Sequence, residues 1–282
     1  MEIPNNCEGK SSGIIYFVIS KSQRMWHYDM AVKSAKSLRF HMPWLAIQLY
    51  TNIGNIPLRN DYFDDVIHTE YPEKIWIYKW ECLKKSPYDY TLHLDADTYI
   101  CDEFSEIFEM LQRFDLVTCM SPHYGLEEKI QGVPLCYPEP AGGFLVWRKN
   151  EKTNWWINRT LELLRARKRF FRADEPTIRQ TMYESDMQIG IVPWEYTCVY
   201  GVPGYLEGKV KIMHGHAPNI EKDAEIFNEV AKRRIFDGGL LYRMRDTHGR
   251  YVELEKTIPY AYRDGDGIIE YPIVYIDERK GK

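Results

Sequence analysis

Two aspartates one residue apart, Asp95 and Asp97, have the spacing that most clearly serves chemistry in this sequence. They follow the apolar run 90–94, which is typical of a buried strand. Side chains alternate along an extended chain, so the two carboxylates can converge on one object. A Mg²⁺ or Mn²⁺ ion shared with a phosphate-bearing substrate would offset the cost of desolvating two adjacent carboxylates. The pattern predicts a metal site where this strand ends.

A histidine after a second apolar run is a third candidate ligand. The run 210–213 is followed by His214 and Gly215. A histidine alone is more often structural or exposed than a ligand, but a place at a predicted strand end favours a ligand. Gly215 would let the backbone or a phosphate approach closely. Two carboxylates with one imidazole favour Mn²⁺ over Ca²⁺.

The elements that must position these residues alternate between apolar runs and helical patterns. We expect strands at 13–20, 44–51, 65–68, 90–94, 115–119, 142–148, 189–193 and 210–213, and helices at 30–39, 76–85, 103–114, 153–168 and 176–183. This progression predicts an α/β fold with a mostly parallel sheet and helices on both faces. Ligands of such sheets bind beyond the carboxyl ends of the strands, where Ser20 and Asp95 would lie.

The chain is expected to form one catalytic domain at 13–220, preceded by a polar tail at 1–12 and followed by an extension at 221–282 packed on the same domain. The extension should hold a helix at 225–236 and a hairpin around 247–249. The proline- and glycine-rich connection 121–141 is long enough to indicate a functional loop.

Composition excludes several function classes. The net charge of -4 comes with only one short basic cluster, so neither nucleic acid nor an anionic membrane surface is an expected partner. The 6 cysteines lie far apart, which argues against a zinc ribbon and favours reduced thiols. No apolar signal segment or bilayer-length run is present, so we expect a soluble, cytoplasmic chain.

The segment 79–108 resembles the metal-binding core of GT-A fold glycosyltransferases, and most of all glycosyltransferase family 8, the glycogenin-like enzymes. The matching features are a lysine on the preceding helix, a tyrosine before the strand, Asp-Ala-Asp-Thr at its end and an Ile-Phe pair on the next helix: Lys79, Tyr88, Asp95 to Thr98, Ile107 and Phe108. Weaker likenesses occur at 141–147, at Asp174-Glu175 and at 210–215, so the resemblance spans about 13–220.

The resemblance implies transfer of a sugar from a nucleoside-diphosphate sugar, expected to be a UDP-sugar, to a glycan or another hydroxyl acceptor. Mn²⁺ or Mg²⁺ would be held by Asp95, Asp97 and His214, with Asp97 the direct ligand and Asp95 shared with the nucleotide ribose. Lys79 would approach the donor phosphates or sugar; an ordinary solvated helix lysine is an equal alternative.

The same resemblance assigns the remaining site residues. The nucleotide base would rest at Ser20 and Lys21, with Tyr16 behind them, and Gly142, Gly143 and Gly215 would also border the donor. Asp174 or Glu175 would orient the donor sugar or act on the acceptor hydroxyl. Alternatively, Asp174 is a plain N-cap of the helix that follows. The connection 121–141 would be a lid that excludes water.

Three departures from the family bear on mechanism. Ala141-Gly142 replaces an Asn-Ser pair, and Glu175 replaces a glutamine, which introduces a carboxylate able to act as a base or nucleophile. The family's Gly-x-x-Lys-Pro-Trp is absent after His214, so Lys211 or Lys222 would contact the diphosphate instead. The resemblance leans towards retention of anomeric configuration.

Other classes also use such carboxylates. A haloacid-dehalogenase-type phosphatase places Asp-x-Asp at a strand end, but Tyr99 stands where that motif prefers Thr or Val, and the motif normally opens the domain. A sugar-nucleotide pyrophosphorylase would need a glycine-rich loop after the first strand, which 20–24 lacks. A non-catalytic module binding a metal or sugar nucleotide is the third alternative.

Overall fold

The computed structural model describes residues 9–21, 25–121, 130–167, 173–199, 204–216 and 220–229, and the short strands 234–236, 243–245, 251–253, 260–263 and 269–270. The chain divides into two compact units, Met1–Pro193 and Trp194–Lys282. Compact units are defined by contacts and a catalytic domain by function, so the domain limits 13–220 and 221–282 stay a prediction. Within the described part of the chain, no helix is both long and apolar enough to span a membrane.

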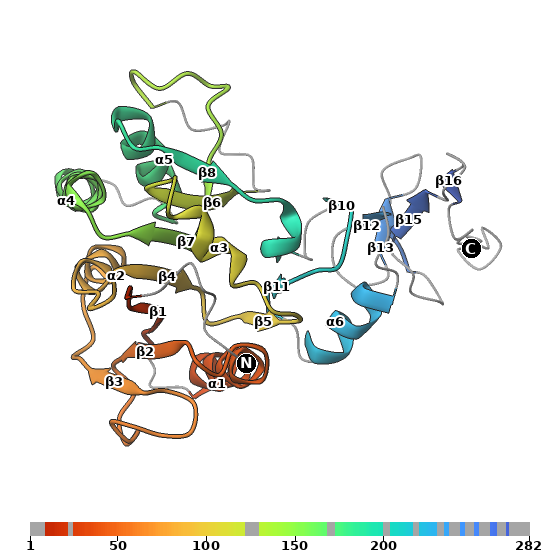
Figure 1. Cartoon of the computed structure of the whole chain (residues 1–282), viewed down its shortest axis with the longest axis horizontal. Coiled ribbons are helices and arrows are strands. Elements are labelled where there is room, and N and C mark those ends of the chain that lie inside the picture. The colour runs from red at the N-terminus through yellow and green to blue at the C-terminus, as the bar shows by residue number, and fades with distance from the viewer. Residues whose placement is uncertain are drawn as a thin grey trace. The chain divides into compact units, whose positions relative to one another are not determined.

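A seven-stranded sheet organises the first unit, in the order β3-β2-β1-β4-β7-β6-β8 (Figure 1). Its strands are β1 (Ser12–Val18), β2 (Ala46–Thr51), β3 (Asp65–His68), β4 (Tyr90–Leu94), β6 (Leu116–Met120), β7 (Pro140–Arg148) and β8 (Ile189–Ile191). Neighbours pair in parallel except at β7, which is antiparallel to both β4 and β6. The mostly parallel sheet is confirmed.

Helices cover both faces of this sheet: α1 (Trp26–His41), α2 (Ile75–Lys84), α3 (Glu106–Met110), α4 (Glu151–Ala166) and α5 (Glu175–Glu184). Alternation along β1 shows the two faces. The Tyr16 hydroxyl bonds Ser34 of α1, whereas Ile15 belongs to the apolar cluster under α2 and α4. β4 is buried along its whole length, as a central strand covered on both faces should be.

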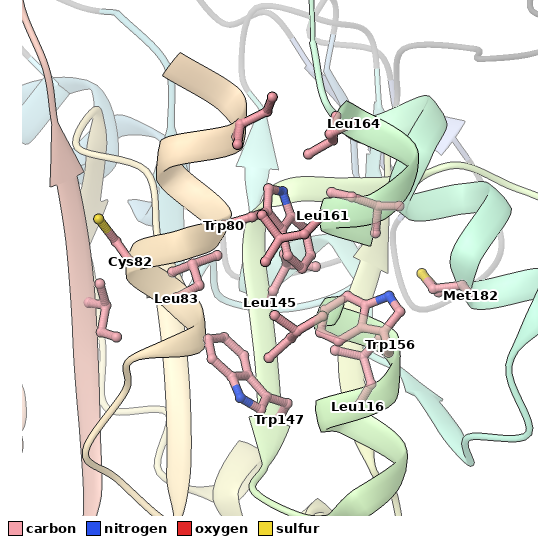
Figure 2. Packing of buried hydrophobic residues seen from close by; sticks show 14 of the residues in the cluster. Trp80, Cys82, Leu83, Leu116, Leu145, Trp147, Trp156, Leu161, Leu164 and Met182 are labelled. Atoms are coloured by element: carbon pink, nitrogen blue, oxygen red, sulfur yellow. The ribbon is translucent and has the colours of Figure 1, made fainter. Parts of the chain in front are cut away.

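Tryptophans dominate the apolar cluster that α2, α4 and α5 form with the sheet (Figure 2). Trp80 of α2 and Trp156 of α4 pack edge to face, with ring centroids 5.0 Å apart, and the ring centroid of Trp147 of β7 lies 6.5 Å from that of Trp156. Trp80 is fully buried, which fixes the position of the preceding residue, Lys79.

The second unit contains short strands and one described helix. β9 (Cys198–Val199) pairs in parallel with β11 (Ile212–His214), after the 3₁₀ turn η3 (Trp194–Tyr196). β10 (Gly204–Leu206), β12 (Arg234–Phe236), β15 (Tyr260–Arg263) and β16 (Ile269–Glu270) pair antiparallel in that order. The expected hairpin is confirmed by β13 (Arg243–Arg245) and β14 (Tyr251–Glu253).

Two predicted helices differ clearly from the structure. The predicted helix 103–114 contains only five α-helical residues, because the chain after Met110 tightens into turns such as Leu111 N–H to the Phe108 carbonyl. The predicted helix 225–236 is wrong at both ends. α6 (Ile220–Glu229) starts five residues earlier, and 234–236 is strand β12, paired with β10 and β15.

Candidate functional site

The Asp95–Asp97 turn leaves the sheet at the carboxyl end of β4. The Asp95 amide donates to the Gly143 carbonyl at 3.0 Å, which extends the pairing of β4 with β7 by one residue. The Thr98 hydroxyl donates to the Asp95 carbonyl at 2.9 Å and closes the turn. The Asp95 side chain keeps 39% of its surface exposed, so a ligand can reach it.

A buried ammonium group lies beside this turn. Lys79 of α2 is only 3% exposed; its Nζ lies 3.4 Å from Asp174 Oδ2 and 3.9 Å from Asp95 Oδ1, and it donates to the Gly142 carbonyl at 3.3 Å. The alternative of a solvated helix lysine is therefore wrong. Burial alone would lower the pKa of Lys79, but Asp174 and Asp95 outweigh it and the pKa is raised, so the group stays charged.

Asp174 precedes α5 and is almost completely buried. Its Oδ2 accepts a hydrogen bond from the Trp80 indole at 2.7 Å and faces Lys79. Asp174 occupies the N-cap position of α5, as the alternative expected, but its side chain makes no capping hydrogen bond. The carboxylate instead pairs with a buried ammonium and a buried indole N–H, either of which would be costly to leave without a partner.

Glu175, the first residue of α5, packs against Gly142 of β7. A Cβ on Gly142 would lie 3.1 Å from the Glu175 carboxyl group, so only glycine leaves this side chain its full space. Burial raises the pKa of Glu175 to about 7, with a further rise from Asp174 that Lys79 partly opposes. Its Oε2 is buried and has no hydrogen-bond partner among the described residues. A carboxyl group that titrates near neutrality can hold or release a proton during a reaction.

At the end of β1, Ser20 is held by a side chain from the end of β2. Asn52 accepts from the Ser20 amide at 2.8 Å and donates to the Ser20 carbonyl at 2.9 Å. Lys21, the next residue, is exposed. Tyr16 is fully buried, so any part that it has in donor binding is indirect.

His214 and Gly215 belong to the second unit. His214 ends β11, and its Nδ1 lies 3.4 Å from the Thr197 hydroxyl. Gly215 has φ 144°, in the region that favours glycine, which explains the residue type after this strand. Residues 122–129 of the predicted lid 121–141 lie outside the described residues.

The sequence reasoning did not single out His93. Its Nδ1 lies 3.0 Å from the Ile15 carbonyl, which can only accept, so Nδ1 carries the proton and Nε2 faces Asp95 Oδ1 at 3.4 Å. Burial and the charge of Lys79 lower the pKa of His93, despite the opposing effect of Asp95. The sequence does carry a signal for His93. Side chains two residues apart on a strand point to the same face, so His93 and Asp95 lie on the same side. Oδ1 of Asp95 therefore lies near two buried side-chain nitrogens, Lys79 Nζ and His93 Nε2.

No family model matches this sequence, and no curated protein matches it significantly. Solved structures do. The galactosyltransferase LgtC in complex with donor and acceptor sugar analogs superimposes with a TM-score of 0.52 at 13% identity, over 77% of this chain and 94% of LgtC. An active-site mutant of LgtC gives 0.51 at 13% identity, over 73% and 88%. The apo form of GlyE from Streptococcus pneumoniae TIGR4 gives 0.51 at 16% identity, over 79% and 57%.

The fold is that of the GT-A glycosyltransferases. The predicted fold class is confirmed, including the mostly parallel sheet flanked by helices. At such low identity the likeness establishes the fold alone, so the chemistry must be argued from this chain's own residues. In the first unit of this GT-A fold, Lys79, Asp95, Gly142, Asp174 and Glu175 are connected by direct contacts.

Proposed function

We propose that this chain is a metal-dependent glycosyltransferase, related to family 8, that moves a sugar from a nucleoside-diphosphate sugar, expected to be a UDP-sugar, to a hydroxyl group of a glycan or glycoconjugate. One observation carries the proposal. Asp95 directly follows β4, the central strand of a GT-A sheet. Its side chain is partly exposed, and its Oδ1 lies 3.9 Å from Nζ of the buried Lys79. Ligands of such open sheets bind at the carboxyl ends of the strands.

The cation-binding residues in this proposal are Asp95 and Asp97 of the first unit and, from the sequence, His214 of the second. Two carboxylates and an imidazole fit Mn²⁺ and also serve Mg²⁺. His214 belongs to the second unit, and its role is proposed from its residue type and its place at the end of β11. When bound, the cation would neutralise negative charge on the leaving diphosphate.

Lys79 and Asp174 would prepare the electrostatics of the site. The ammonium of Lys79 is held by Asp174 and the Gly142 carbonyl, so its charge is in place before a donor binds. A fixed positive charge of this kind would favour donor phosphates. Asp174 is buried behind Lys79 and Trp80, which makes it a positioning residue in this proposal.

Glu175 is the residue that we propose for chemistry on the sugar or acceptor. Its ionised form could orient the donor sugar, accept a proton from the acceptor hydroxyl or attack the anomeric carbon. Its buried Oε2 is not used by any described residue. The resemblance to family 8 implies that Glu175 stands where that family has a glutamine.

The remaining donor contacts are proposed from the sequence and the strand ends. Ser20 and Lys21 follow β1, where the nucleotide base would rest. The Gly142 carbonyl accepts from the Lys79 side chain and the Gly143 carbonyl from the Asp95 amide, so these glycines would act by positioning those two residues near the donor. Gly215 would give a diphosphate close access to the backbone.

Calorimetry with a panel of nucleoside diphosphates and nucleotide sugars, with and without Mn²⁺, tests the proposal. We expect one nucleotide to bind only when Mn²⁺ is present, and Asp97→Asn to abolish that binding. Asp186→Asn is a matched control, because Asp186 is 83% exposed and its salt-bridge partner is the surface residue Lys152. If no nucleotide binds while simple phosphate esters are hydrolysed, a phosphatase replaces the transferase.

A further inference from the structure

Three buried hydroxyl groups connect β1 and α1 to the backbone of the Asp95–Asp97 turn. The Tyr16 hydroxyl lies 2.8 Å from Ser34 Oγ, and Ser34 Oγ lies 2.7 Å from Thr98 Oγ1. The Thr98 hydroxyl lies 2.9 Å from the Asp95 carbonyl oxygen. Tyr16, Ser34 and Thr98 are each at most 2% exposed, so water does not compete for these bonds.

The direction of all three hydrogen bonds follows from the last one. A carbonyl oxygen can only accept, so the single proton of Thr98 points to Asp95. Ser34 must then donate to Thr98, and Tyr16 must donate to Ser34. Burial raises the pKa of the Tyr16 hydroxyl, which keeps it protonated as the first donor. Only one arrangement of protons satisfies the whole chain.

The far side of the same turn is also attached to α1. Ser37 Oγ accepts from the Ile100 amide at 2.9 Å and donates to the Ser34 carbonyl at 2.8 Å. Asp97 therefore lies between two points, the Asp95 carbonyl and the Ile100 amide, that buried side chains hold. These bonds limit where the backbone of Asp97 can move, although none of them touches its carboxylate.

We propose that Thr98, Ser34 and Tyr16 form a positioning relay that orients the Asp95–Asp97 turn and thereby sets the affinity of the cation site. This inference rests on the proposed function, since it concerns the same carboxylates. Groups behind metal ligands commonly change metal affinity 10- to 100-fold when removed. The relay also gives Tyr16 a role that its complete burial allows, through hydrogen bonds instead of contact with a donor.

Calorimetric titration of the full chain with Mn²⁺ alone, without a nucleotide, tests the relay. Thr98→Val removes the hydroxyl that holds Asp95, and we expect about a tenfold loss of Mn²⁺ affinity. Thr98→Ser keeps the hydroxyl and should restore wild-type affinity. Thr160→Val is the matched control, because it removes another fully buried threonine hydroxyl, bonded to Thr181 at 2.9 Å on α4 and α5. It should lower thermal stability and leave Mn²⁺ affinity unchanged.

Two further variants keep the test decisive if Thr98→Val fails to fold. Ser34→Ala removes the donor to Thr98 and should weaken Mn²⁺ binding less than Thr98→Val does. Tyr16→Phe leaves the protons of Ser34 and Thr98 in place and should have the smallest effect. Equal Mn²⁺ affinity in wild type, Ser34→Ala and Thr98→Val would overturn the relay. An unchanged affinity in Asp97→Asn would instead overturn the metal site itself.

Discussion

The ammonium of Lys79 lies 3.4 Å from the carboxylate of Asp174, and both side chains are at most 3% exposed. The Trp80 indole donates to the same carboxylate oxygen at 2.7 Å. The pair connects α2 to the start of α5 in the interior of the first unit and holds Lys79 beside Asp95. Two buried opposite charges are tolerated when each is paired and hydrogen-bonded, and this pair meets both conditions.

Lys79→Met should destabilise the protein strongly, because it leaves the Asp174 carboxylate buried without a charge partner. We expect the free energy of unfolding to fall by about 3–5 kcal/mol in urea denaturation. Adding Asp174→Asn should recover part of this loss. The exposed pair Lys152 and Asp186, 3.6 Å apart, is the control, and Lys152→Met should cost less than about 1 kcal/mol. Equal effects at the two pairs would contradict the buried assignment.

The pKa of Glu175, raised to about 7 from 4.5 by burial, predicts a pH-dependent stability. The folded protein holds this proton more tightly than the unfolded chain does. The contribution of protonated Glu175 to the free energy of unfolding is therefore fully present below about pH 4.5 and is lost as the pH rises through about 7. Over this window the wild type should lose up to about 3 kcal/mol relative to Glu175→Gln. Urea denaturation at both ends of the window measures the difference, and parallel profiles would contradict the raised pKa.

The same titration predicts a pH dependence of turnover. If ionised Glu175 acts on the sugar or acceptor, kcat should rise as the pH passes through about 7. Glu175→Gln should lower kcat and remove this rise. A variant that turns over like the wild type, with the same profile, would assign the chemistry to another group.

Gly142→Ala should impair turnover more than stability. The added Cβ would lie 3.1 Å from the Glu175 carboxyl group and displace it. We expect a loss in kcat of less than about 10²-fold, because a misplacement of about 1 Å can cost that much and the required shift is smaller. Gly54→Ala is the control, because a Cβ there meets nothing within 4 Å. Normal turnover in Gly142→Ala would show that the position of Glu175 is not critical.

The sheet could be predicted largely from local patterns, because each strand is an apolar run with a clear stop. β3 was predicted at its observed limits, and the predicted strand 90–94 coincides with β4. The parallel direction of most strands was also predicted, but the direction of β7 was not. Strand β7 is buried from Pro140 to Trp147 and runs antiparallel to its neighbours, and a buried run carries no signal of direction.

The site could be predicted only in part, because some of its contacts join residues that are distant in the sequence. Asp95 and Asp97 follow a recognisable strand, so their position could be predicted. Lys79 was named, but the residues that bury it are distant in sequence: its partner carbonyl is 63 residues away, and the Trp80 to Asp174 bond spans 94. Local patterns do not encode such pairs. The contact between Gly142 and Glu175 also emerges only once β7 and α5 are packed together.

The central claim is tested most directly by turnover of a nucleotide sugar with a labelled sugar group, in the presence of Mn²⁺ and a panel of glycan acceptors. We predict release of the nucleoside diphosphate, with the label recovered on an acceptor. Release should stop on chelation of the metal or with Asp97→Asn, and should continue with Asp186→Asn. Intact donor throughout the panel, or turnover that persists in Asp97→Asn, would contradict the account.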